Sequence, residues 1–262
     1  MAAVRDFWVR AALVVSLLIP VYFLVAALGT RFGMLDWTVG FGTMTFRWGV
    51  LVLMGGAGFA LIGLLMALFT PPCRGVGPAL IALLIPLLGI GYGVYVMQTA
   101  RTIAPIHDIS TDLVDPPGFS EAVVRARAAV TDHNDLDLLA KRTRDGRAFI
   151  DLQRQAYPDI VPVPTGLDQY RAFDVALALA RAQHWTMGAV DPQAGTIEAT
   201  ARSLWFGFTD DIAIRVRPDG TGARIDMRSV SRVGGSDLGA NARRMRPFLL
   251  QLRQRLQEAE SA

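Results

Sequence analysis

The chain has 262 residues, 52% of them apolar, and a formal net charge of +3. Only seven of its 49 charged side chains precede residue 100, and the part that follows has 21 basic and 21 acidic side chains. A domain that binds nucleic acid carries its own excess of positive charge, so this balance argues against a nucleic-acid partner.

Three runs without a charged residue fill the first hundred positions, at 11–30, 48–73 and 75–100. Each is long enough to cross a hydrocarbon core of about 30 Å at ~1.5 Å per residue. The sequence therefore predicts a transmembrane unit over residues 1–100 and a multi-pass protein whose partner is the lipid bilayer. The expected spans are 11–30, 49–70 and 78–98.

Arg5 and Arg10 precede the first apolar run, as in a signal anchor that keeps the N-terminus inside. Other arginines near the spans are divided between the two sides and do not decide the orientation. The anchor-like start favours a bacterial inner-membrane protein whose soluble domain lies on the periplasmic side. The loop at 31–47 is rich in aromatic residues, and we expect it to lie along the membrane surface.

Small residues recur one helical turn apart in the second and third spans. The pairs are Gly56 with Ala60, Gly63 with Ala67, and Gly89 with Gly93. Such spacing lets helix backbones approach closely, either within one unit or between two copies. We favour packing within the three-helix unit over dimerisation.

After the membrane unit, residues 101–118 contain three prolines and no helical periodicity, which predicts an extended connector. Residues 119–262 then predict a soluble domain. Ser120 is typical of an N-cap and indicates a helix to residue 130. A second helix is expected over 134–141, and the region from there to residue 164 is rich in turn residues.

From residue 165 the pattern is clearer. Thr165 and Asp168 predict a capped helix over 167–183. Two hairpins follow, the second turning at Asp219-Gly220 between alternating runs, and an amphipathic helix with Ser236 as its N-cap ends the chain. This order predicts a two-layer α+β domain with a four-stranded antiparallel sheet covered by helices.

A two-residue turn at Asp219-Gly220 fixes the register of the second hairpin. It places Ile214 opposite Ile225 on an apolar core face, and Arg215 opposite Arg224 on the other face. Two facing arginines are unfavourable unless an anion or a carboxylate lies between them. Asp226 is the carboxylate that we favour over a bound anion.

Three stretches resemble the motifs of a widespread family, Domain of Unknown Function 1499. They are IHDISTDLVDPPGF, QAYPDI and the run that begins LWFGFTDDIAIRVRPDG and ends near residue 252. The resemblance covers most of residues 106–252 and implies a bacterial envelope protein. The family pattern carries no established catalytic residue, so the resemblance assigns none here. Pro247 departs from the family's last helix and is expected to kink it.

The sequence contains no recognisable catalytic constellation. Its histidines, His107, His133 and His184, lack the spacing of a zinc site, and no serine stands in a nucleophile elbow. We therefore predict no catalytic residue, no metal and no cofactor. An enzyme would need His107 or His184 to converge with aspartates in a cleft. Lys141 is the only lysine among 26 basic residues, which we ascribe to composition.

Two groups of residues are candidates for binding. Glycines before Ser236 would present backbone N–H groups to an anion if a helix starts there, although we favour an ordinary capped helix start. The candidate anion contacts are Arg215, Arg224, Arg232, Ser236, Arg243 and Arg244. The candidate membrane or cavity aromatics are Trp205, Phe206 and Phe208, for which packing within the domain is the alternative.

These observations favour a membrane-tethered envelope protein whose soluble domain is not an enzyme and either binds a partner protein or scaffolds an assembly. The alternative is a lipid- or amphiphile-binding domain with an apolar cavity between the sheet and the last helix. An enzyme of unknown reaction is the third hypothesis.

Overall fold

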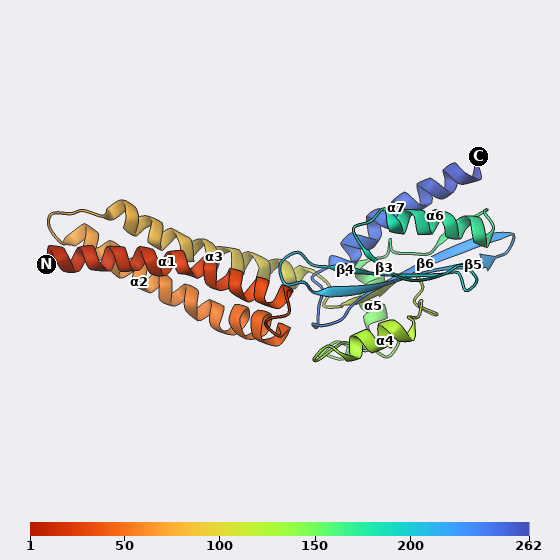
Figure 1. Ribbon diagram of the computed structural model, residues 1–262, viewed down its shortest axis with the longest axis horizontal. Helices are drawn as coiled ribbons and strands as arrows, with labels where there is room; N and C mark the ends of the chain where they lie inside the picture. Colours follow the sequence, from red (N-terminus) through yellow and green to blue (C-terminus); the bar gives the residue numbers. More distant parts are fainter. Residues whose placement is uncertain (262) are drawn as a thin grey trace. The chain divides into compact units, whose positions relative to one another are not determined.

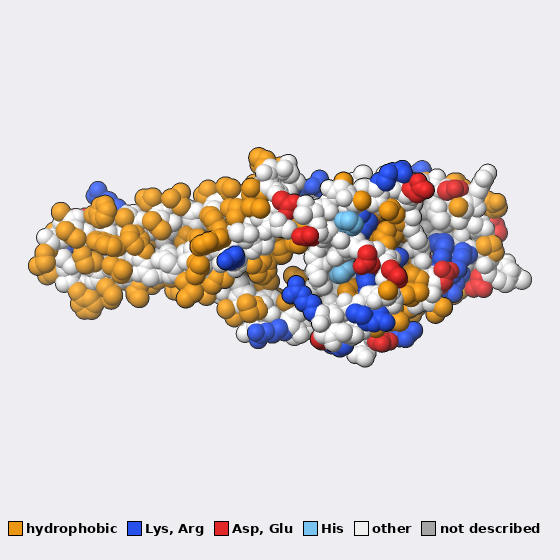
Figure 2. Space-filling view, turned by 90° about the horizontal axis from the view of Figure 1, so that it is seen from below, with side chains coloured by type: hydrophobic (Ala, Val, Ile, Leu, Met, Phe, Trp, Pro, Cys, Tyr) orange, Lys and Arg blue, Asp and Glu red, His pale blue; other side chains and the backbone are white. Residues whose placement is uncertain are grey.

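The computed structural model describes residues 1–261, which form two compact units (Figure 1). The first unit contains Met1–Thr99 and Leu204–Gly207, and the second contains Ala100–Ser203 and the residues from Phe208 onward. Apolar side chains cover the helices of the first unit, whereas Lys, Arg, Asp and Glu side chains gather on the second (Figure 2).

The first unit is helical. Its elements are α1 (Ala2–Arg31), the π-helix η1 (Thr38–Trp48), α2 (Gly49–Phe69) and α3 (Val76–Thr102). Three helical segments, with η1 and α2 counted as one, are long and apolar enough to cross a membrane. The expected surface loop at 31–47 is wrong for most of its length, because η1 runs directly into α2. Threonine hydroxyls support this wide helix by donating to carbonyls five residues earlier.

Close backbone approach within the first unit occurs at glycines. A Cβ atom added to Gly56 would lie 2.5 Å from Cδ1 of Ile19 on α1, and one added to Gly89 would lie 2.5 Å from Cδ2 of Leu53 on α2. Packing within the unit is therefore confirmed at these two positions. Gly93 faces open space and takes no part in it.

The second unit is an antiparallel sheet with helices on both faces. The strands are β1 (Asp108–Ser110), β2 (Val163–Thr165), β3 (Thr186–Asp191), β4 (Thr196–Arg202), β5 (Thr209–Asp219) and β6 (Gly222–Ser231). The helices are α4 (Glu121–Ala128), α5 (Phe149–Ala156), α6 (Gln169–Arg181) and α7 (Ala240–Glu260). In Figure 1, α6 and α7 lie on one face of the sheet and α4 lies on the other.

The antiparallel α+β fold is confirmed, but the sheet has six strands instead of four, in the order β1-β6-β5-β4-β3 with β2 also on β6. The predicted hairpins form β3 to β6. Both additional strands pair with the outer edge of β6, where Asp108 lies opposite Val230 and Val163 lies opposite Ile225. Each has three residues, which is too short for a periodic pattern. β1 lies within the expected connector at 101–118.

The predicted helix at 134–141 is wrong. The segment forms turns in which Asp135 and Asp137 side chains accept hydrogen bonds from backbone N–H groups, and such bonds compete with helix formation. A helix, α5, instead forms inside the region that is rich in turn residues, where the sequence assigns no element. Farther along, Asp168 caps α6 by accepting from two backbone N–H groups.

The last helix starts later than expected. α7 begins at Ala240, and Asp237 accepts from the N–H groups of Gly239 and Asn241, so Ser236 is not the N-cap. Gly239 has a φ of +78°, which turns the chain into the helix. α7 is a single helical segment through Pro247, which lies on its exposed side.

The β5–β6 hairpin has a different register from the one predicted. Asp219 pairs with Gly222, so the turn residues are Gly220 and Thr221, and Ile214 lies opposite Met227 instead of Ile225. Gly220 has a φ of +58°, which a glycine accommodates without strain. Because the shift is two residues, each side chain keeps the predicted face of the sheet.

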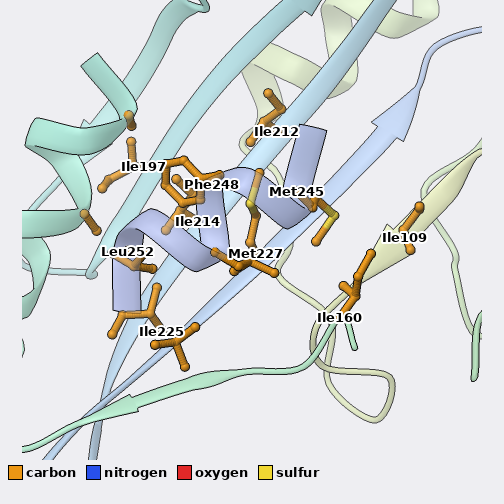
Figure 3. Close-up of a cluster of buried hydrophobic side chains, with 14 of the residues drawn as sticks. Ile109, Ile160, Ile197, Ile212, Ile214, Ile225, Met227, Met245, Phe248 and Leu252 are labelled. Atoms are coloured by element: carbon orange, nitrogen blue, oxygen red, sulfur yellow. The ribbon is translucent and has the colours of Figure 1, made fainter. Parts of the chain in front are cut away.

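The core fills the space between the sheet and helices α6 and α7. Figure 3 shows part of this cluster, with Ile109, Ile160, Ile197, Ile212, Ile214, Ile225, Met227, Met245, Phe248 and Leu252 labelled. Phe173 of α6 and Phe248 of α7 are almost completely buried. The amphiphile hypothesis places a cavity in this space, which these side chains occupy.

Candidate functional site

The face of the sheet opposite α7 is covered by charged side chains, because alternate residues of β5 and β6 point away from the core. We call this the charged face; it consists of Glu198, Asp211, Arg215, Arg217, Arg224, Asp226 and Arg228. The segment from Thr111 to Lys141 supplies partners to it. Asp211 and Asp226 are fully buried, so their charges depend on these partners.

Asp108 on β1 is the centre of one buried cluster. Arg228 donates to both of its carboxylate oxygens, at 2.9 and 2.8 Å, and Lys141 donates to Oδ2 at 2.6 Å. Arg228 also donates to the carbonyls of Pro117 and Leu136. Burial raises the pKa of Asp108, but the hydrogen bonds and charges of Arg228 and Lys141 outweigh it and leave that pKa below its ordinary value.

Asp211 on β5 is the centre of a second cluster. Arg127 of α4 donates to Oδ2 at 2.6 Å, and Arg232 donates to both oxygens. Arg127 is itself almost completely buried and also donates to the carbonyls of Asn134 and Ser231. These bonds fix α4 and the following segment against the sheet.

Two arginines do face each other across the β5–β6 hairpin, but they are not the predicted pair. Arg217 lies opposite Arg224, and Arg215 lies opposite Asp226. Both members of the facing pair donate to Asp226 and to Asp112, which comes from the segment after β1. The prediction of a carboxylate between the arginines is thus confirmed, and Asp226 and Asp112 supply it. Burial raises the pKa of Asp112, but hydrogen bonds from backbone N–H groups and the charges of the arginines outweigh it and leave that pKa below its ordinary value.

The other candidate anion contacts are not brought together. Arg244 donates to Asp210 at 2.5 Å on the core side of the sheet, while Arg232 is held on the charged face. Arg243 donates to the carbonyl of Leu238. Because α7 starts at Ala240, no helix N-terminus presents its N–H groups at the glycines before Ser236.

The aromatic candidates lie in the turn between β4 and β5. Trp205 is 60% exposed, whereas Phe206 and Phe208 are partly buried. The Phe206 ring packs edge-on against Phe41 at 5.0 Å within the first unit. Neither cavity described below is lined by these three residues.

A cavity of about 430 Å³ opens beside the Asp108 cluster. It is lined by His107, Asn134, Asp135, Asp137, Ala140, Lys141, Arg142 and Phe149. His107 is 7% exposed, and neither ring nitrogen has a hydrogen-bond partner among residues 1–261. Its ring packs edge-on against Phe149, with centroids 4.9 Å apart. A buried polar group without a partner is rare in native structures and marks this cavity as a candidate binding site.

The histidine is held neutral. Burial lowers the pKa of His107 to about 4, and the positive charge of Lys141 acts in the same direction, against Asp108 and the backbone of Gly235. The Gly235 backbone lies near the ring, but the two do not meet the distance and angle requirements of a hydrogen bond. Burial also lowers the pKa of Lys141, although Asp108 opposes the shift. A neutral imidazole offers one donor and one acceptor to a ligand.

The remaining polar side chains of the cavity have partners. Asn134 donates to two carbonyls, and Arg142 donates to the carbonyls of Leu139 and Lys141. Asp135 and Asp137 accept backbone N–H groups. None of these aspartates forms a hydrogen bond with the histidine ring. Among the described residues, no group of three His, Cys, Asp or Glu side chains is placed to hold a metal.

A second cavity, of about 370 Å³, lies beside the outer edge of β6. Arg224 in its lining donates to Asp112, and Gln153 exchanges two hydrogen bonds with the backbone of Ser110. None of its lining residues has a fully buried polar side-chain atom without a partner. It therefore lacks the unsatisfied buried group that distinguishes the His107 cavity.

The fold defines the class of protein. It is a protein with three helices apolar enough to cross a membrane, followed by an antiparallel α+β domain. The model of a family described as "Protein of unknown function (DUF1499)" matches residues 108–252, and the chain belongs to that family. The family predicted from the three motifs is thus confirmed. The match contains every residue that lines the cavity except His107, which immediately precedes it. Among curated proteins, none matches the chain.

Sequence reasoning did not single out the cavity. The sequence marks His107 only as a histidine without zinc-site spacing. That Lys141 is the sole lysine of the chain is the one available signal. The cavity depends on bringing residues 107, 141 and 228 together, which no local pattern reveals.

Proposed function

We propose that this protein is a non-enzymatic binding protein of the bacterial cell envelope, tethered to the membrane by its first unit. The binding site is the cavity beside His107. The observation that carries this proposal is a buried imidazole without hydrogen-bond partners on the wall of a cavity large enough for a small molecule.

The surrounding charges support the proposal. Asp108, Asp211 and Asp226 are each bonded to at least two cationic side chains, so the buried carboxylates of the charged face are satisfied. An unsatisfied buried donor or acceptor costs about 1–3 kcal/mol. A domain that satisfies its buried carboxylates in this way but leaves His107 unpaired has a site that a ligand would complete.

Thermal unfolding of the full-length protein in lipid nanodiscs tests this function. A mixture of small molecules that spans acids, bases and neutral amides is added, and the melting temperature of the second unit is followed. At least one component should stabilise the wild type and leave His107→Phe unchanged, because that variant keeps the ring but loses both nitrogens. If none stabilises the wild type, or if both proteins respond equally, the proposed function is wrong.

The proposal includes a multi-pass arrangement in the inner membrane with the second unit on the periplasmic side. Arg5 and Arg10, which lie in α1 before its apolar run, support an N-terminus inside. With three spans, the exposed Cys73 between α2 and α3 would then be cytoplasmic. The exposed Thr221 in the β5–β6 turn would be periplasmic.

Cysteine labelling tests this arrangement. An impermeant maleimide is added to cells with a permeabilised outer membrane. It should label Thr221→Cys in a Cys73→Ser background and leave the natural Cys73 unlabelled. The reverse pattern would place the domain in the cytoplasm. Release of the protein from membranes by an alkaline carbonate wash would refute the spanning unit itself.

A further inference from the structure

We propose that the ligand of the His107 cavity is a small organic carboxylate with an apolar body, an inference that rests on the proposed function. The acid group binds between His107 and Lys141, and its body lies against Phe149. Three features of the cavity lead to this class of ligand: the charge of the buried cluster, its unused hydrogen-bond donors and its apolar wall.

The first feature is an excess of buried positive charge. Asp108 is a single carboxylate, yet it pairs with two cations, Lys141 and Arg228, and all three side chains are at most 5% exposed. The carboxylate of Asp135 is 3.9 Å from Nζ of Lys141, but its side chain is 72% exposed and is therefore screened by water. An anion in the cavity would neutralise the cluster from its open side.

The second feature is the set of unused donors. The Lys141 ammonium has three N–H groups, and one donates to Asp108 while none of the others has a hydrogen bond among residues 1–261. Arg228, by contrast, donates to Asp108 and to two carbonyls. Lys141 thus has donors left over, and His107, whose ring nitrogens have no partner, lines the same cavity. A carboxylate has two oxygens and can accept from both side chains.

The third feature is the apolar part of the lining. The Phe149 ring and the Ala140 methyl group line the cavity beside the polar groups. A volume of about 430 Å³ is within the range of small-molecule sites, which combine an apolar lining with a few placed polar groups. An amine would meet Lys141 and Arg142, both cationic, and the lining carboxylates already accept backbone N–H groups.

Isothermal titration of the full-length protein in nanodiscs tests the ligand class with three matched probes. Benzoate carries the acid, benzamide is its neutral counterpart, and benzylamine carries the opposite charge. Benzoate should bind at least about tenfold more tightly than benzamide, because charge-assisted hydrogen bonds are lost in the amide. Benzylamine should not bind measurably.

Two variants locate the site. His107→Phe and Lys141→Gln should each weaken benzoate at least about tenfold, and Arg181→Gln, on the exposed surface of α6, should bind as the wild type does. In Lys141→Gln, Asp108 keeps its paired bonds to Arg228, so the domain should fold. Should that variant fail to fold, the His107→Phe result decides the location of the site alone.

The outcomes separate the two proposals. If benzamide or benzylamine binds as well as benzoate, and His107→Phe abolishes that binding, the carboxylate is refuted and the binding function stands. If benzoate binds equally to wild type and His107→Phe, the assignment of the acid to this cavity is refuted. If none of the three probes binds, but another component of the small-molecule mixture used for thermal unfolding stabilises only the wild type, the carboxylate is refuted and the binding function stands.

Discussion

The unpaired imidazole of His107 has a consequence for stability that can be measured without a ligand. Replacing it by phenylalanine keeps an aromatic ring against Phe149 and removes two buried polar atoms that have no partners. We expect His107→Phe to increase the free energy of unfolding by about 1–3 kcal/mol, which raises the Tm by roughly 2–4 °C per kcal/mol in a domain of this size.

Thermal unfolding at pH 7.5, followed by near-UV circular dichroism, checks this expectation. Tyr170→Phe is the matched control, because Tyr170 is 63% exposed and its hydroxyl group is outside the core. A lower Tm for His107→Phe would show that the ring nitrogens make stabilising hydrogen bonds in the folded protein.

Asp211 differs from a surface carboxylate in its burial. Asp211→Asn leaves Arg127 and Arg232 without their shared counter-charge inside the domain. Breaking a buried pair costs about 3–5 kcal/mol, whereas an exposed pair contributes about 0–1 kcal/mol. Asp159→Asn, which removes the half-exposed partner of Arg246, is the control. Equal Tm changes in the two variants would mean that the Asp211 cluster adds no stability.

At the scale of the elements, β2 depends on a glycine in the neighbouring strand. A Cβ added to Gly222 would overlap the carbonyl oxygen of Thr165. Gly222→Ala should therefore displace β2 from β6, with a loss of about 1–3 kcal/mol and faster hydrogen exchange of the β2 amides. Gly118→Ala, where the added Cβ meets open space, should exchange as the wild type does. Unchanged protection of β2 in Gly222→Ala would contradict this pairing.

The sequence predicts the elements with long periodic patterns and the short helix α4, but it does not predict β1, β2 and α5. β4 to β6, α6 and α7 follow from alternation or from helical spacing, which are local signals. β1 and β2 have three residues each and are strands only because β6 is beside them. The Asp219-Gly220 signal placed the turn one residue early, since Asp219 itself pairs with Gly222.

The same distinction applies to the candidate site. The pattern of β5 and β6 predicted facing arginines and a carboxylate between them, and only the choice of Arg217 over Arg215 depended on the register. The His107 cavity could not be predicted, because its walls come from segments that are separate in sequence. Burial and missing partners are properties of the folded chain alone.

For the whole molecule, His107 makes stability depend on pH. Its pKa is lowered by burial from 6.5 to about 4, so between these values the unfolded chain binds a proton that the folded domain does not. Stability is therefore full above pH 6.5 and declines as the pH falls, by up to ~1.4 kcal/mol per unit. His107→Phe lacks this decline.

The Tm difference between His107→Phe and the wild type should widen as the pH falls from 7.5 to 5. Burial raises the pKa of Asp237, and that group also contributes to the pH dependence, but it is present in both proteins and cancels in the comparison. A Tm difference that stays constant over this range would show that the imidazole takes up its proton at the same pH in the folded domain as in the unfolded chain.

The pairing of β1 with β6 determines when the domain can fold during synthesis. Asp108 lies opposite Val230, so the first strand waits for more than a hundred further residues to leave the ribosome. Contacts this distant in sequence form late. The helices of the first unit are complete by Thr102 and can enter a bilayer while the rest of the chain is still unfolded.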